Sequence, residues 1–136
     1  MSQPLSDLNY QSLARFRHAL RVFNRFSENA ARAAGITPAH HQLLLAIRGH
    51  DGRDAPSLTD VAGRLQLKLH SAGELVSRAE SRNLVIRSTD PADHRRTLLS
   101  LTKEGEAKLA ELSILHRREL RRFRREMNDL QLELEH

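Results

Sequence analysis

Hydrophobic residues recur at a helical spacing in the N-terminal part of the chain. From Leu13 to Ala34 they follow one another at steps of three and four positions, with arginines between them, which is the pattern of one apolar helix face. The members of this stripe are Leu13, Phe16, Leu20, Phe23, Ala30 and Ala34, with Ser27 filling the one gap. Gly35 is expected to end the helix, because glycine is favoured just past a helix C-terminus.

Three shorter helices are predicted between Thr37 and Asn83. Thr37 followed by Pro38 is a typical helix start. Ser57 followed three residues later by Asp60 is a second one, similar to a capping box. Asn83 is expected to end the third helix, because asparagine tolerates the left-handed conformation. The residues expected to face inward in the last two helices are Leu58, Val61, Ala62, Leu65, Leu69, Ala72, Leu75, Val76 and Ala79.

The pattern changes after Asn83. Two short apolar runs, 84–88 and 97–101, flank a charged loop and predict a β-hairpin. Thr102 is a suitable cap for a last helix that begins at about Lys103 and continues to the end of the chain. The apolar stripe of this helix is Leu109, Leu112, Leu115 or His116, Leu120, Phe123, Met127 and Leu130.

Two short helices followed at once by a hairpin indicate a winged helix-turn-helix, in a mainly α protein whose β-hairpin is the wing. The two terminal stripes are longer than a small domain needs for its own core, so we expect them to pair with a second subunit. The expected dimerisation residues are Leu13, Phe16, Leu20, Phe23, Leu112, Leu120, Phe123 and Met127. The predicted division is 1–35 and 103–133 for dimerisation and 36–102 for DNA binding, with 134–136 interpreted as a tag remnant.

Composition narrows the partner class. The chain of 136 residues has 22 Lys and Arg against 17 acids, a formal net charge of +5. This balance favours a polyanion, nucleic acid before an acidic membrane surface. There is no cysteine, which excludes disulfides and thiolate catalysis. No apolar run is long enough to span a bilayer and the first residues do not have the pattern of a signal peptide, so we expect a cytoplasmic protein without a membrane partner.

No motif points to an enzyme. The 6 glycines are scattered rather than gathered in a phosphate-binding loop, and no serine lies in a nucleophile-elbow context. No two of the eight histidines are three or four positions apart, and the neighbours His40 and His41 point about 100° apart on a helix. We therefore predict no catalytic residue, no metal site and no cofactor.

Four segments in order resemble one family of regulators. The run "DPADHRRTLLSLTKEG" is similar to the wing and following helix start of MarR-type transcriptional regulators. The runs "ITPAHHQLLLAIRGH", "SLTDVAGRLQL" and "HSAGELVSRAESRNLVIR" are similar to the family's successive helices. The resemblance extends from Ile36 to Glu111, while the two ends match only in length and helical character.

The resemblance implies an obligate homodimer that binds a pseudo-palindromic double-stranded operator and is released by small phenolic or aromatic acids. It also implies that Arg95 reaches into the minor groove and that Asp93 holds the wing in shape. A histidine of the pair His40 and His41 is a candidate for lining the effector cleft between the dimer apex and the DNA-binding lobe. The alternative is that both are ordinary core or surface residues.

The helix expected to enter the major groove presents several polar residues outward, namely Lys68, His70, Ser71, Glu74 and Arg78. Glu74 is unusual on a DNA-facing surface. It can accept from a cytosine amine or, as we favour, pair with Arg78 at the i, i+4 spacing. Arg96 is expected to be either a phosphate contact or a solvated charge.

The run "HRRELRRFRRE" contains six arginines in nine positions, Arg117 to Arg125. It fits a basic surface for nucleic acid or membrane. The interpretation we favour is a solvated helix face that also pairs with acids of the partner subunit. For the whole chain two functions stay open: a sequence-specific transcriptional regulator, favoured as a repressor, or a winged-helix interaction module or nonspecific architectural DNA binder.

Overall fold

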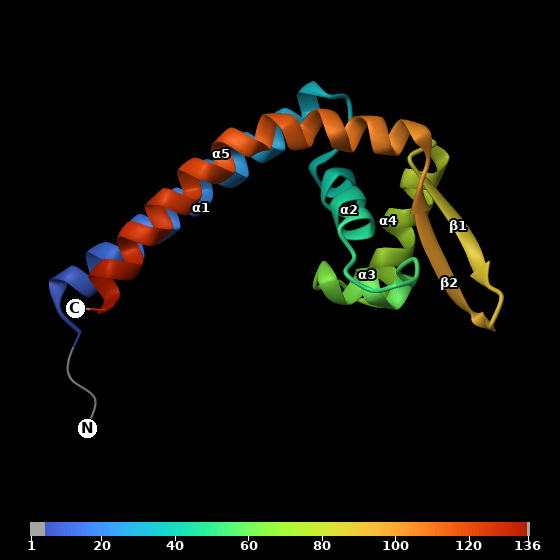
Figure 1. Ribbon diagram of the computed structural model, residues 1–136, viewed down its shortest axis with the longest axis horizontal. Coiled ribbons are helices and arrows are strands. Elements are labelled where there is room, and N and C mark those ends of the chain that lie inside the picture. The colour runs from blue at the N-terminus through green and yellow to red at the C-terminus, as the bar shows by residue number, and fades with distance from the viewer. Residues whose placement is uncertain (1–4, 136) are drawn as a thin grey trace.

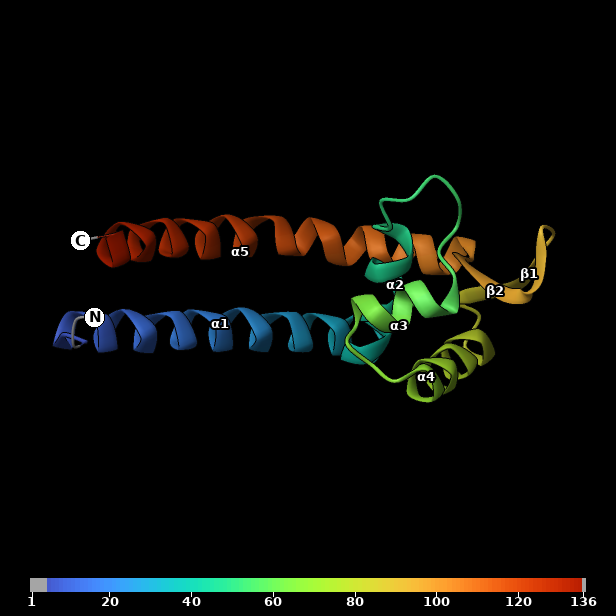
Figure 2. The same ribbon diagram turned by 90° about the horizontal axis from the view of Figure 1, so that it is seen from below.

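The computed structural model describes residues 5–135, with side chains for residues 5–130. It consists of a long arm and a small lobe (Figure 1). The arm is formed by α1 (Asp7–Ala33) and the outer part of α5 (Lys103–Glu135), which lie side by side so that the start of α1 and the end of α5 meet at its tip (Figures 1 and 2). None of the described helices is long and apolar enough to cross a membrane. The proposed tag remnant, 134–136, lies outside the described side chains.

The lobe contains α2 (Pro38–Arg48), α3 (Leu58–Arg64), α4 (Leu69–Ser81) and the antiparallel hairpin of β1 (Val85–Asp90) and β2 (Asp93–Leu101). This order confirms the predicted winged helix-turn-helix. The two strands extend further toward the hairpin tip than predicted. Pairing runs from Val85 with Leu101 to Thr89 with Thr97, and after an irregularity it resumes at Asp90 with Asp93. Charged residues were predicted to form a loop, but an exposed hairpin accommodates them with their side chains in solvent.

The helix boundaries follow local signals in the sequence. The Thr37 and Ser57 side chains accept hydrogen bonds from the backbone N–H groups of His40 and Asp60, as predicted from their positions. Gly35 has φ +85° and Asn83 has φ 59°, which is the left-handed conformation expected at both helix ends. Thr102 Oγ1 accepts from Gly105 N at 2.9 Å, so its predicted role at the start of α5 is confirmed.

The core of the lobe lies where α2, α3, α4 and the hairpin meet the end of α1 and the start of α5. It includes the fully buried Leu43, Leu44, Val76, Leu99 and Leu112. The prediction that Leu69 faces inward was wrong, since this side chain is 54% exposed. The buried positions of α4 begin one turn later, at Ala72, and the first turn extends beyond the core.

The buried α1 residues of the arm differ in part from the predicted stripe and share Ser27 with it. They are the small residues Ser12, Ala19, Ser27 and Ala31, which let the two helices approach closely. Leu13 and Phe16 are 51% and 37% exposed, while Leu20 and Phe23 are half-buried. Leu13 and Phe16 of the predicted stripe therefore lie beside the contact between α1 and α5 rather than inside it.

On α5 the stripe is closer to the prediction. Leu112 is buried, Phe123 and Met127 are half-buried, and Leu120 is 55% exposed. His116 rather than Leu115 occupies the ambiguous position, because His116 is half-buried and Leu115 is 49% exposed.

Candidate nucleic-acid interface

The outward face of α4 is open to solvent. The predicted residues Lys68, His70, Ser71, Glu74 and Arg78 are all exposed. Lys68 is the N-cap residue of α4 and makes no side-chain capping bond, so its ammonium group is available at the helix N-terminus. Backbone N–H groups and the helix dipole at such an end favour an anion.

A shallow groove of about 490 Å³ lies between α4 and β1. It is lined by His70, Gly73, Glu74, Ser77, Arg78 and Arg87. Three of the five predicted residues, His70, Glu74 and Arg78, line this groove, while Lys68 and Ser71 lie outside its lining. The groove joins the exposed helix face and the base of the wing into one polar surface.

Arg87 of β1 is a residue of this surface that sequence reasoning missed. Its guanidinium Nη2 donates to Gly73 O at 3.2 Å and to Ser77 Oγ at 3.0 Å, and its Nε lies 3.6 Å from Glu80 Oε1. These contacts fasten β1 to α4 and fix the spacing between helix and wing. The available signal was a lone cation directly after the apolar residues Leu84–Ile86, within the predicted strand.

Glu74 pairs with a different residue from the one favoured. Its carboxylate lies 3.2 Å from His70 Nε2, one turn earlier on α4, so the preference for an Arg78 partner was wrong. Both partners were available at the i, i+4 spacing, and only the side-chain conformations decide between them. Arg78 therefore keeps its charge for an external anion.

The wing tip is organised by two aspartates. Asp90 Oδ1 accepts from Ala92 N at 2.9 Å, which stabilises the turn. Asp93 Oδ1 accepts from Arg95 N at 3.1 Å and from Arg95 Nε at 3.2 Å. Asp93 thus accepts both from a backbone N–H of the wing and from the Arg95 side chain.

Arg96 points back toward the lobe. It lies 3.4 Å from Asp90 and 3.8 Å from Asp60 of α3, and the neighbouring β2 residue Leu99 donates its N–H to Pro56 O at 2.9 Å. The Ser57 N–H, donated to Asp60, holds the pKa of that carboxyl below its usual value and keeps it charged. Arg96 thus braces the wing against α3. This structural role differs from the two that were predicted for it, a phosphate contact or a solvated charge.

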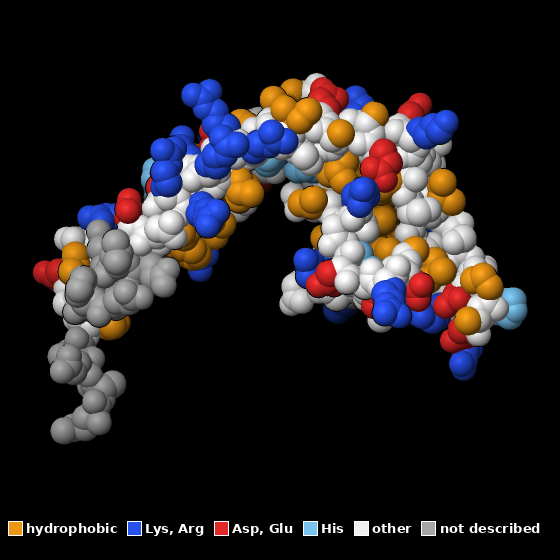
Figure 3. Space-filling view, in the orientation of Figure 1, with side chains coloured by type: hydrophobic (Ala, Val, Ile, Leu, Met, Phe, Trp, Pro, Cys, Tyr) orange, Lys and Arg blue, Asp and Glu red, His pale blue; other side chains and the backbone are white. Residues whose placement is uncertain are grey.

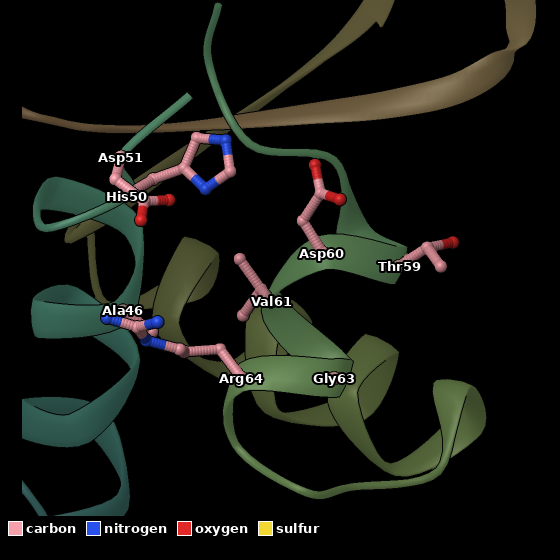
Figure 4. A pocket seen from close by; sticks show the side chains of 8 residues that line it. All are labelled: Ala46, His50, Asp51, Thr59, Asp60, Val61, Gly63 and Arg64. Carbon is pink, nitrogen blue, oxygen red and sulfur yellow. The ribbon is translucent and has the colours of Figure 1, made fainter. Parts of the chain in front are cut away.

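A cavity of about 500 Å³ lies between the end of α2, the loop after it and α3. Figure 4 shows His50 and Asp60 at one side of it and Arg64 at the other. The Asp60 carboxylate is already engaged by Ser57 and Arg96. The Asp60 carboxylate of this cavity therefore serves the helix cap and the wing brace.

His40 and His41 are buried, with 3% and 4% exposure. The His41 ring lies 4.9 Å from the ring of His116 on α5, and His116 also faces Phe26 of α1 at 5.2 Å. Burial lowers the pKa of both α2 histidines, helped by Arg82 and Arg78 for His40 and by His116 for His41. His41 thus belongs to the packed junction of arm and lobe, and an effector role for either residue stays a prediction.

The chain is similar in sequence to known transcriptional regulators. A MarR family model matches residues 34–96. The transcriptional regulator HosA of Escherichia coli O111:H- is 34% identical over 97 residues, covering 68% of this chain and 68% of HosA. The chain spans about half the length of the curated relatives it matches first, 56% and 48%.

Solved structures share the fold. Staphylococcus aureus MepR in a complex with DNA superimposes with a TM-score of 0.73 at 20% identity, over 88% of this chain and 89% of that one. Bordetella bronchiseptica BpsR, whose DNA binding is regulated by 6-hydroxynicotinic acid, gives a TM-score of 0.63 at 25% identity, over 79% of each chain.

Proposed function

This chain belongs to the MarR family, and on that premise we propose that it is a transcriptional regulator that binds double-stranded operator DNA as a homodimer. In this proposal α4 enters the major groove and the wing follows the adjacent minor groove. Residues 36–102 form the DNA-binding region, and the helices of 1–35 and 103–133 join the two subunits.

The observation that carries the DNA-binding role is the pre-formed wing tip beside the open face of α4. Asp93 fixes the start of the Arg95 side chain, and that side chain is 92% exposed. Arg95 is suited to a narrow minor groove because guanidinium sheds water more readily than ammonium. Lys68, His70, Ser71 and Arg78 supply donors for phosphates and base edges, and Glu74 can accept from cytosine.

The exposed apolar residues of the arm support the homodimer. Leu13, Phe16 and Leu120 keep 51%, 37% and 55% of their surface exposed in the single chain. Leu5, Leu8 and Tyr10 are exposed along the same arm. A contiguous apolar surface of this kind favours association with a second copy.

We further infer that a small aromatic acid releases the protein from DNA, so that it acts as a repressor. The support is the family relationship and the regulation of BpsR by 6-hydroxynicotinic acid. The junction of arm and lobe around His40 and His41 is the proposed effector region, since a ligand there would change the angle between the two parts.

The test is binding of the purified protein to the DNA upstream of its own gene, against a duplex of equal length and random sequence, at two salt concentrations. Protection of two half-sites about one helical turn apart, about 10 base pairs, that survives competitor DNA would support the proposal. Equal and salt-labile binding to both duplexes would contradict it and favour a nonspecific architectural binder.

A further inference from the structure

Most of the excess positive charge lies on the arm rather than on the DNA-binding lobe. Residues 7–33 and 113–130 contain eleven arginines and five acids, whereas residues 34–112 contain eleven basic and ten acidic residues. These residues therefore carry an excess of six positive charges, and Glu133 and Glu135 near the end of α5 reduce the excess of the whole arm to four, in a chain whose formal net charge is +5. The winged-helix contacts described above leave this charge unexplained.

The densest part of the charge is the arginine segment, residues 117–125 of α5. Its six arginines, Arg117, Arg118, Arg121, Arg122, Arg124 and Arg125, are all exposed. Within residues 5–130, the ion pair found in this segment is Arg122 with Glu126 at 3.6 Å. Figure 3 shows blue side chains gathered along the upper side of the arm, while hydrophobic side chains appear on its underside.

A second copy of the chain does not remove the net excess of positive charge on the arm. In a two-fold homodimer both subunits bring the same arm, so the excess positive charge of the arm is doubled. The arginine segment and the residue after it contain two acids, Glu119 and Glu126, and both are half-buried. Neutralisation must therefore come from small counterions or from an external polyanion.

The chemistry of the surface favours phosphates of a duplex. The arm has arginine and no lysine among residues 7–33 and 113–130, and guanidinium binds phosphate oxygens in a bidentate way. Arg117, Arg121 and Arg125 follow one another at i, i+4 steps, about 6 Å each along the helix, which suits a row of backbone phosphates. The segment presents no exposed aromatic ring, as single-strand binding by base stacking would require.

We propose that the outer face of α5 at Arg117, Arg121 and Arg125 binds the phosphate backbone of a second DNA duplex, independently of its sequence. The inference rests on the proposed function, because the first duplex is held by α4 and the wing. Figure 1 places this part of α5 along the arm, away from α4 and the hairpin. Because this face lies on the arm rather than on the lobe, the duplex that it binds is a second one, and the dimer bridges two DNA segments.

The test is a two-duplex capture assay on the full-length protein. One random-sequence duplex of about three helical turns, about 30 base pairs, is immobilised, protein is added, and a second fluorescent duplex is captured at about 0.15 M salt. The wild type is expected to capture the second duplex. The R117Q/R121Q/R125Q variant is expected to bind the first duplex but to lose at least tenfold in capture of the second, with a salt slope smaller by about 3.

Matched controls separate a specific face from overall charge. The variant R17Q/R21Q/R25Q removes the same number of charges from α1 and is expected to keep capture, and R117K/R121K/R125K is expected to retain most of it. Equal loss in both glutamine variants, unchanged capture in the α5 variant, or a wild type that holds only one duplex would each overturn the proposal. So would binding to phosphatidylserine vesicles without capture of the second duplex.

The failure of this inference and the failure of the proposed function give different results. Loss of selectivity for the upstream DNA with intact two-duplex capture would contradict the specific regulator and support the DNA-binding surface on the arm. Selective footprinting with no capture of a second duplex would support the specific regulator and contradict the DNA-binding surface on the arm. Light scattering on each variant tests whether the oligomeric state is unchanged. If the triple variant changes it, the single variants R121Q and R125Q provide the readout, and each is expected to lose about twofold in capture of the second duplex.

Discussion

Asp93 and Arg95 form a local clamp at the tip of the wing. One carboxylate oxygen of Asp93 accepts from the backbone N–H of Arg95 at 3.1 Å and from its Nε at 3.2 Å. The first bond fixes the backbone and the second fixes the side-chain direction, yet the Arg95 side chain is 92% exposed. The guanidinium is thus oriented before any DNA arrives, which reduces the entropy cost of binding.

Replacing Arg95 by alanine is expected to weaken DNA binding without unfolding the protein. A hydrogen bond to a charged group contributes about 1.5–3 kcal/mol, so the dissociation constant should rise roughly tenfold to a hundredfold. Fluorescence anisotropy with the footprinted duplex measures the affinity, and thermal melting checks the fold. Wild-type affinity with a native melting temperature would contradict the assignment of Arg95 to the minor groove.

Asp93→Ala tests the clamp separately from the charge. It keeps the guanidinium but removes both bonds that orient it, so we expect a smaller loss of affinity than in Arg95→Ala. Because the variant also removes a negative charge near phosphates, nonspecific binding should not fall. If Asp93→Ala bound the specific duplex more tightly than the wild type, electrostatic repulsion rather than orientation would be the main effect of this carboxylate.

Leu120→Glu on α5 is expected to convert the dimer to a monomer or to weaken it strongly. The leucine is 55% exposed in the single chain, so the charge costs little in the monomer but would be buried and unpaired in the proposed interface. Light scattering at micromolar protein measures the mass. Ile86→Glu, at a residue of β1 that is 48% exposed, is the control and should stay dimeric. A monomeric wild type would contradict the dimer.

Acid is expected to destabilise the junction of arm and lobe. Burial holds the pKa of His41 below its ordinary value of 6.5, so the unfolded chain binds the proton more readily than the folded one. The stabilising contribution is complete above about pH 6.5 and decreases as the pH falls toward the lowered pKa. The free energy of unfolding, measured in urea between pH 7.5 and 5, should therefore fall with acid.

His41→Gln is expected to reduce this pH dependence, and the exposed His70→Gln is the control. His40 is also buried with a lowered pKa, so some dependence should remain. Asp60 acts at lower pH, because the pKa of this carboxyl is already below its usual value of 3.8. The same slope in wild type and His41→Gln would show that His41 does not contribute.

Gly105→Ala is expected to destabilise the start of α5. An added Cβ would overlap the backbone carbonyl of Leu84, which already accepts a hydrogen bond from Thr102 N at 3.1 Å. Overpacking of this kind costs about 1–3 kcal/mol. Urea titration measures the loss, with Gly63→Ala as the matched control. A Cβ at Gly63 meets nothing within 4 Å, so that change should be neutral or slightly stabilising. Equal stability of wild type and Gly105→Ala would contradict the close contact.

The order of elements could be predicted because each depends on short-range signals. The caps at Thr37, Ser57 and Thr102 satisfy helix N–H groups within three residues, and Gly35 and Asn83 adopt the left-handed backbone that ends a helix. The Asp93–Arg95 clamp is equally local, spanning two residues. Such features are encoded in neighbouring residues and need no knowledge of the rest of the chain.

The tertiary structure decided what depends on distant neighbours. Small residues rather than Leu13 and Phe16 face α5, because two helices determine together which side of each is covered. Arg87 bonds with residues of α4 ten and fourteen positions away. The total charge predicts a polyanion as partner, but only the fold separates the basic arm from the nearly neutral lobe. Charge is summed along a sequence, whereas electrostatic recognition depends on its position in space.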